Sequence, residues 1–64
     1  DNQEVSDGMV CYGCAVLDAA NHPIAAVAVS FPVNDPMLKN KDQVITNIKN
    51  IAERISKRLG ANLS

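Results

Sequence analysis

Two long apolar segments joined by a short polar loop constrain the fold of this chain more than any other feature. The first, residues 9–17, reads MVCYGCAVL, and the second, residues 24–31, reads IAAVAVSF. Both lack charged residues, and both have the length and the turn-forming flanks of strands that are buried on two faces. Pro32 ends the second run, because proline cannot donate to a sheet ladder. The loop at residues 18–23 therefore predicts an antiparallel hairpin.

The C-terminal part has the repeat of an amphipathic helix. From residue 44 onward, apolar residues recur at the i, i+3, i+4 and i+7 spacing of one helix face: Val44, Ile45, Ile48, Ile51, Ala52, Ile55 and Leu59. Asn40 and Gln43 have the spacing of a capping box, and Gly60 suits the position after the helix end. We predict a helix over residues 41–59, preceded at residues 34–36 by a turn or one short helical turn.

These elements predict an α+β fold, in which a hairpin is followed by a helix. Residues 1–8 are polar and end in the turn signal Asp7-Gly8, so no strand is predicted there. One helix covers one face of a sheet, so the sheet is expected to continue with strands that this chain lacks. With 64 residues and Asp1 in place of an initiator Met, the sequence is interpreted as the C-terminal part of a single domain.

Composition excludes several classes of function. The formal net charge of −1 gives no electrostatic footprint for DNA, RNA or an anionic membrane. The longest apolar stretch is far short of the ~20 residues that a membrane-spanning helix needs. At 47% hydrophobic the chain is too apolar for a disordered tail, and its cysteine content is low for a secreted disulfide scaffold. The sequence favours a reducing, cytoplasmic setting.

The hairpin register separates small from bulky side chains. Placing Leu17 opposite Ile24 aligns small residues on one face: Cys11 with Ser30, Gly13 with Ala28, and Ala15 with Ala26. The other face carries the bulkier residues and is expected to pack on the helix. Two interpretations of the small face stay open, a shallow ligand pocket with polar groups at one end or close packing of another helix or strand.

The Cys11-Tyr12-Gly13-Cys14 segment does not predict a metal or redox site. A separation of three along a strand directs the two thiols to opposite faces, and a zinc site would need further ligands. His22 lies in the loop and is interpreted as a turn residue. No acid, base and nucleophile come together in the three predicted elements, so we predict no enzyme, no catalytic residue, no metal and no cofactor.

Several of these features together resemble the IclR family of bacterial transcriptional regulators. They are an acidic pair, a Cys at fixed spacing, a hairpin of small residues and a closing helix: Asp1-x-x-Glu4, Cys11, Gly13, Val16, Asp18, residues 23–30 and residues 52–60. The resemblance covers nearly the whole chain. Tyr12 and Leu17 depart from the family pattern, which usually has an aliphatic residue and an aromatic residue or His at these positions.

The resemblance implies a ligand-sensing function. Family members have a winged helix-turn-helix DNA-binding domain followed by a GAF-like effector-binding domain, and this chain is similar to the C-terminal part of the second. The family's effector positions fall on Asp1, Cys11, Ala28 and Ser30. The implied partners are a small carboxylate or sugar acid, further copies of the protein in a dimer or tetramer, and DNA through an upstream domain. Ala28 stands where a member that binds a small oxoacid has Ser.

Two alternatives remain for the function. The chain is either an oligomerisation or structural module without a ligand, or a redox or metal sensor that uses Cys11 and Cys14. Binding of a small organic acid that alters DNA binding, as in a cytoplasmic repressor, is the function that the resemblance favours.

Overall fold

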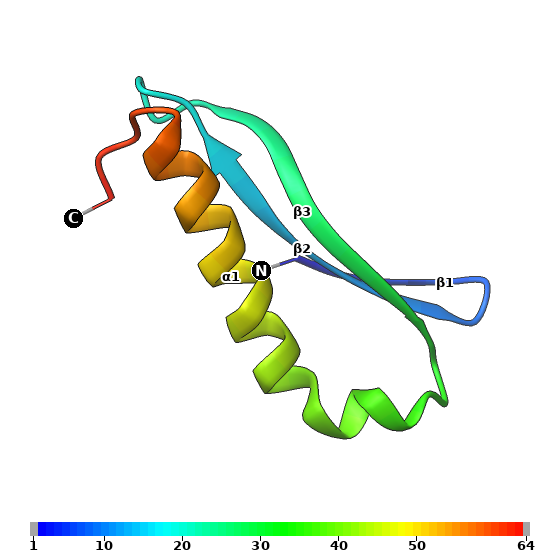
Figure 1. Cartoon of the computed structure of the whole chain (residues 1–64). Coiled ribbons are helices and arrows are strands. Elements are labelled where there is room, and N and C mark those ends of the chain that lie inside the picture. Colours follow the sequence, from blue (N-terminus) through cyan, green and yellow to red (C-terminus); the bar gives the residue numbers. More distant parts are fainter. Residues whose placement is uncertain (1, 64) are drawn as a thin grey trace.

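The computed structural model describes residues 2–63, apart from the side chains at positions 2, 4 and 6. The elements in chain order are β1 (Asn2–Ser6), β2 (Met9–Leu17), β3 (Pro23–Pro32), the 3-10 helix η1 (Pro36–Asn40) and α1 (Lys41–Arg58). The strands form one antiparallel sheet in the order β1-β2-β3, and α1 runs along one face of it (Figure 1). This arrangement confirms the predicted α+β class and the hairpin followed by a helix.

Strand β1 corrects the prediction that residues 1–8 hold no strand. It pairs antiparallel with β2, with Ser6 opposite Met9, so only Asp7 and Gly8 form the turn. Both turn residues have positive φ, 49° and 76°, as a type I′ hairpin turn requires. The turn signal was therefore correct, but the polar strand before it was missed. Further strands of the sheet were expected only outside this chain, but one of them, β1, lies within it.

The register of β2 and β3 confirms the prediction from Met9 to Val16. Cys11 pairs with Ser30, and Val16 pairs with Ala25. The predicted pairing of Leu17 with Ile24 is wrong, because Leu17 pairs with Pro23 after a register shift. The loop causes this shift, since a hairpin loop fixes which residues face each other where the strands leave it.

Asp18 organises this loop. Its backbone N–H donates to the His22 carbonyl at 2.9 Å, and its carboxylate accepts from the N–H groups of Ala20 and His22, both at 2.9 Å. Asn21 completes the turn with a φ of 61°, a conformation that asparagine tolerates better than most residues. These bonds place Asp18 opposite His22 and therefore Leu17 opposite Pro23.

We expect Asp18→Ala to lower the free energy of unfolding by about 1 kcal/mol, because two loop N–H groups lose their acceptor. Urea denaturation followed by circular dichroism measures the change. Asp18→Asn is the matched control, because its side-chain oxygen still accepts hydrogen bonds. A loss for Asp18→Asn as large as for Asp18→Ala would show that the acceptor is not what stabilises the loop.

The core lies between α1 and the bulkier face of the sheet. Val10, Tyr12 and Ile48 form its centre, with exposed fractions of 6%, 5% and 3%. Five partly buried residues pack against this centre: Cys14, Val27, Val29, Leu38 and Ile45. The core is thus built from β2, β3, η1 and one side of α1.

The buried side of α1 is narrower than predicted. Its buried residues are Ile48, Ala52 and Ser56, spaced four apart. Three other apolar residues that were assigned to the same face are largely exposed: Ile51 at 44%, Ile55 at 41% and Leu59 at 45%. A helix lying on one sheet face contacts it through a single row of side chains, so the flanking residues of a wide apolar stripe stay outside the contact.

The ends of the helical segment partly follow the prediction. Asp35 caps η1 by accepting from the Met37 N–H at 2.8 Å, and Pro36 follows at the first helical position. The predicted capping box is wrong, because the Asn40 side chain makes no cap hydrogen bond. Asn40 is itself the last residue of η1, so the chain enters α1 from a helical turn and not from an extended segment.

The C-terminal end of α1 follows the prediction more closely. Gly60 has a φ of 94°, and its N–H donates to the Lys57 carbonyl at 3.0 Å. The Ala61 N–H donates to the Ser56 carbonyl at 2.9 Å, which completes a Schellman motif. α1 ends at Arg58, one residue before the predicted end.

Candidate functional site

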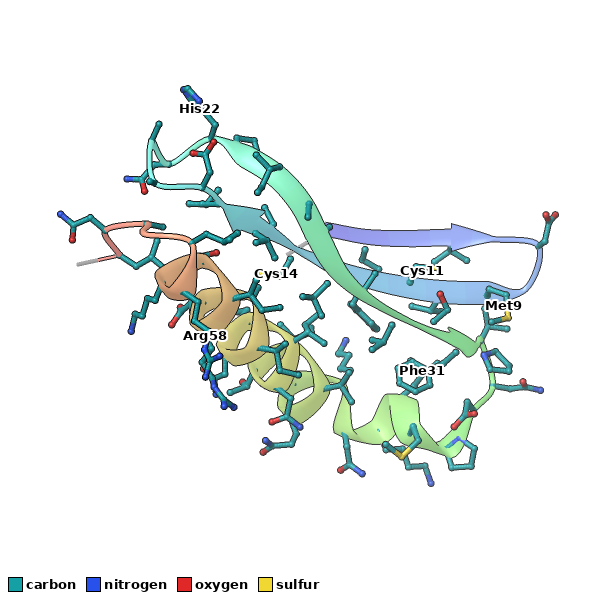
Figure 2. The ribbon with its side chains drawn as sticks, turned by 45° about the horizontal axis from the view of Figure 1, so that its top comes forward. Met9, Cys11, Cys14, His22, Phe31 and Arg58 are labelled. Carbon is teal, nitrogen blue, oxygen red and sulfur yellow. The ribbon has the colours of Figure 1, made fainter. Side chains whose placement is uncertain are left out.

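The face of the sheet that points away from α1 carries small side chains along the central parts of β2 and β3, with Met9 and Pro32 at one end. Because residues two apart in a strand share a face, the register places six small residues side by side in its central part: Cys11, Gly13, Ala15, Ala26, Ala28 and Ser30. We call this set the small-residue face. The neighbouring positions point to the other side, and Figure 2 shows Cys14 between the sheet and the helix.

Cys11 and Ser30 form the polar end of the small-residue face. The strands place them directly opposite each other, and Cys11 Sγ lies 3.0 Å from Ser30 Oγ. Either group can donate in this hydrogen bond. Ser30 is exposed and Cys11 is half-buried, so both remain open to a ligand. The prediction that these two side chains are neighbours is confirmed.

Gly13 and Ala28 lie beside this pair and leave the face flat. A Cβ atom built on Gly13 would meet the Val27 carbonyl oxygen at 3.8 Å and the Ala28 Cβ at 3.9 Å, which are ordinary contacts. The fold of this chain therefore does not require glycine at position 13. Its missing side chain, together with the short side chain of exposed Ala28, leaves space above the sheet.

The other predicted site residue, Asp1, lies outside the described residues. Strand β1 adds a position to the site that the sequence did not place. The Cα atom of Glu4 is the register partner of Cys11, so Glu4, Cys11 and Ser30 occupy one row across the three strands. This row could not be predicted, because residues 1–8 lacked the apolar alternation of a strand.

Ser56 is a second residue that the sequence reasoning missed. Its hydroxyl accepts from the Leu17 N–H at 2.8 Å and donates to the Ala52 carbonyl at 2.8 Å, with only 1% of the residue exposed. The Asp18 N–H faces β3, so by strand alternation the Leu17 N–H faces the opposite edge. Strand β1 does not reach Leu17, because its described pairing with β2 ends where Asn2 lies opposite Gly13. The Ser56 hydroxyl thus accepts the hydrogen bond that a neighbouring strand would otherwise accept from the Leu17 N–H.

The sequence did contain a signal for Ser56. It follows Ile48 and Ala52 at intervals of four, in the row of α1 that faces the sheet. A hydroxyl in such a row needs a hydrogen-bond partner, which predicts a contact with a backbone group.

A shallow hollow of about 330 Å³ lies along α1, lined by Ile51, Arg54, Ile55 and Arg58. It belongs to the helix that covers the opposite face of the sheet, so it is separate from the Cys11–Ser30 pair. Both arginines are exposed. We assign the candidate site to the sheet, where polar groups and open space occur together.

Cys14 and His22 lie apart from this site. Cys11 and Cys14 are on opposite faces of the sheet, as predicted, and Cys14 packs against the core. His22 is exposed in the loop that Asp18 organises. Among the side chains that the structure describes, which leave out that of Glu4, no three of His, Cys, Asp or Glu form a group that could hold a metal ion.

A family model described as the C-terminal region of the bacterial transcriptional regulator IclR matches residues 1–57. The chain belongs to the IclR family. It forms part of the effector-binding C-terminal region of IclR regulators, which is not an enzyme. Searches of curated proteins and of solved structures found no match.

Membership of the IclR family agrees with the resemblance and with the prediction that the chain has no catalytic function. The matched residues 1–57 include all three strands and nearly all of α1. In the described part of this IclR chain, no helix has the length and the hydropathy that crossing a membrane requires.

Proposed function

We propose that the small-residue face binds a small organic acid, and that Cys11 and Ser30 hold its carboxylate. The observation that carries this proposal is the 3.0 Å contact between the two side chains beside the open surface of Gly13 and Ala28. A thiol and a hydroxyl that now bond to each other can both turn and donate to an anion. Effector binding by this region of IclR regulators supplies the functional context.

A sugar acid is the subclass that we favour. The IclR resemblance also assigns Asp1 to the site, and a second carboxylate beside an anionic ligand is unfavourable. This cost is removed when Asp1 accepts a hydrogen bond from a hydroxyl group of the effector. The methyl side chain of Ala28 offers no such polar contact.

The bound effector acts by shifting an equilibrium. It stabilises the arrangement of effector-binding regions to which it binds more tightly, and so alters DNA binding by a separate domain. We place this switch in a cytoplasmic repressor. The direction and size of the change depend on the difference in effector affinity between the two arrangements.

Titration calorimetry with gluconate and pyruvate tests the site. Ser30→Val removes a hydroxyl that would bond to a charged group, and such bonds contribute ~1.5–3 kcal/mol, so we expect at least a tenfold rise in the Kd. Thr46→Val is the control, because it removes an exposed hydroxyl from α1. Equal affinity of Ser30→Val and the unmodified chain would refute the assignment. Absence of binding to both acids would favour the ligand-free oligomerisation module.

Gly13→Val tests whether the open surface itself is needed. We expect the Kd for the bound acid to rise at least tenfold, because the added methyl groups project over the small-residue face. The free energy of unfolding should change by less than ~1 kcal/mol, because the first added carbon has room and valine favours strands. Calorimetry and urea denaturation measure the two effects. Unchanged affinity in a folded Gly13→Val variant would place the ligand elsewhere.

Ala28→Ser tests the preference between acids. It adds a hydroxyl where the IclR member that binds a small oxoacid has one, so we expect the affinity for pyruvate to rise several-fold relative to gluconate. Parallel titrations give the ratio, with Ala15→Ser as a control at another exposed position of the same face. An equal change in ratio for Ala15→Ser would mean that position 28 has no special role.

A further inference from the structure

The hollow along α1 combines aliphatic surface with positive charge. Its volume of about 330 Å³ is within the size range of small-molecule sites, and four side chains surround it: Ile51, Arg54, Ile55 and Arg58. Each is three or four residues from its neighbours in this set, so all four meet on one side of the helix. Two aliphatic side chains and two guanidinium groups therefore border the same open space.

The two guanidinium groups are available to a ligand. Arg54 and Arg58 are exposed, and neither makes an ion pair or a hydrogen bond with another described residue. In Figure 2, Arg58 projects from α1 on the side that faces away from the strands. The acidic residues of α1, Asp42 and Glu53, lie on the opposite side of the helix by its periodicity. The hollow thus carries local positive charge, although the net charge of the chain is −1.

Helix stability accounts for only part of this arrangement. A basic residue in the last turn interacts favourably with the helix dipole, and Arg58 is the last residue of α1. Arg54 lies one turn earlier, where this effect has largely faded. Ile51 and Ile55 are 44% and 41% exposed, so much of their aliphatic surface remains outside the core. Together these four side chains suit a molecule that is both aliphatic and negatively charged.

We propose that this hollow binds an organic anion in which one carboxylate is attached to a short alkyl chain. The carboxylate lies between Arg54 and Arg58, whose planar guanidinium groups can each donate parallel hydrogen bonds to it. The alkyl chain covers Ile51 and Ile55 and removes their exposed surface from water. The small-residue face is on the other side of the sheet, so this site is separate from the proposed effector site and does not depend on it.

Titration of the chain with hexanoate, followed by the NMR shifts of its backbone amides, tests the proposal. We expect saturable shifts that are largest at residues 51–58. The compound 1-hexanol lacks the charge and inorganic phosphate lacks the alkyl chain, so each should bind there at least tenfold more weakly. Equal binding of 1-hexanol would overturn the proposal. The absence of saturable shifts at residues 51–58 would also overturn it, and would indicate that the hollow is a packing surface for another protein segment.

The double variant Arg54→Gln with Arg58→Gln removes both positive charges. Both positions are exposed and glutamine is a good helix former, so the fold should be retained, which circular dichroism checks. We expect the Kd for hexanoate to rise at least tenfold. Lys49→Gln removes a positive charge from a different side of α1 and should change the Kd less than twofold. If the double variant does not fold, Arg54→Gln alone should still raise the Kd several-fold, and an unchanged Kd in either folded variant would refute the proposal.

Ser30→Val separates this site from the proposed effector site. Hexanoate is itself a small organic acid, so it can also bind to the small-residue face. The shifts at residues 51–58 should nevertheless saturate at the same hexanoate concentration in Ser30→Val as in the unmodified chain. Loss of these shifts in Ser30→Val would place the anion on the sheet and overturn the proposal. Gluconate binding that is unaffected by Ser30→Val would refute only the effector site, so the two proposals fail separately.

Discussion

Replacing Ile48 by alanine should unfold a large fraction of the chain at room temperature. Ile48 is 3% exposed and joins Val10 and Tyr12 at the centre of the core. Truncating a buried isoleucine to alanine costs ~2–5 kcal/mol, and a single core of this size seldom supplies more than ~3–5 kcal/mol. The expected loss is therefore comparable to the whole stability of the chain. Thermal and urea denaturation followed by circular dichroism measure it.

Ile51→Ala is the control for this prediction, because it makes the same change three residues further along α1. Ile51 is 44% exposed and lines the hollow on the helix. Its truncation should cost less than ~1 kcal/mol, as is usual for partly exposed positions outside the core. A loss for Ile51→Ala equal to that for Ile48→Ala would mean that α1 packs on the sheet through a different row.

Ser56→Ala should produce the second large loss of stability, ~1–3 kcal/mol. It removes the acceptor of the Leu17 N–H, and a partly buried donor without a partner costs about this amount. Alanine has a higher helix propensity than serine by up to ~0.5 kcal/mol, so this difference in propensity alone would stabilise the variant. A net destabilisation would therefore originate in the lost contact with β2.

Two measurements separate this effect from a general weakening of α1. The Leu17 amide should exchange with solvent faster in Ser56→Ala than the other amides of β2 do. Thr46→Ala, at an exposed position of the same helix, should change stability by less than ~0.5 kcal/mol. A Leu17 amide that stays as protected as before would contradict the bridging role of Ser56.

The sheet register was predictable where side chains alone determine it. β2 and β3 are uncharged, with small residues on one face and bulkier residues on the other. Only one alignment of the two strands puts all the bulkier residues on the buried face. The shift at Leu17 was not predictable on this basis. It depends on the Asp18 carboxylate and on the backbone conformation of Asn21, and neither appears in a pattern of apolar residues.

Strand β1 and the width of the α1 contact were also not predictable from the pattern of apolar residues. β1 has an irregular polar sequence, and Val5 on it is 62% exposed, so its pairing with β2 leaves little signal in hydrophobicity. The apolar stripe of α1 correctly predicted a helix. It did not predict which of its residues meet the sheet, because that depends on where the helix axis lies over the strands.

The candidate site was predictable in part for the same reason. The hairpin register alone brought Cys11 beside Ser30, and their 3.0 Å contact confirms that step. The row that these residues share with Glu4 required β1. The roles of Asp1, Cys11, Ala28 and Ser30 in effector binding remain a prediction from the family resemblance.

The division of the sheet into two faces has a consequence for how such a regulator can evolve. Core packing uses the residues that face α1, whereas Gly13, Ala28 and Ser30 have no place in that core. Under the proposed assignment of the effector to the small-residue face, substitutions there alter ligand preference while the chain stays above its stability threshold. On that proposal, a lineage would change its effector through single replacements on this face, without compensating changes in the helix.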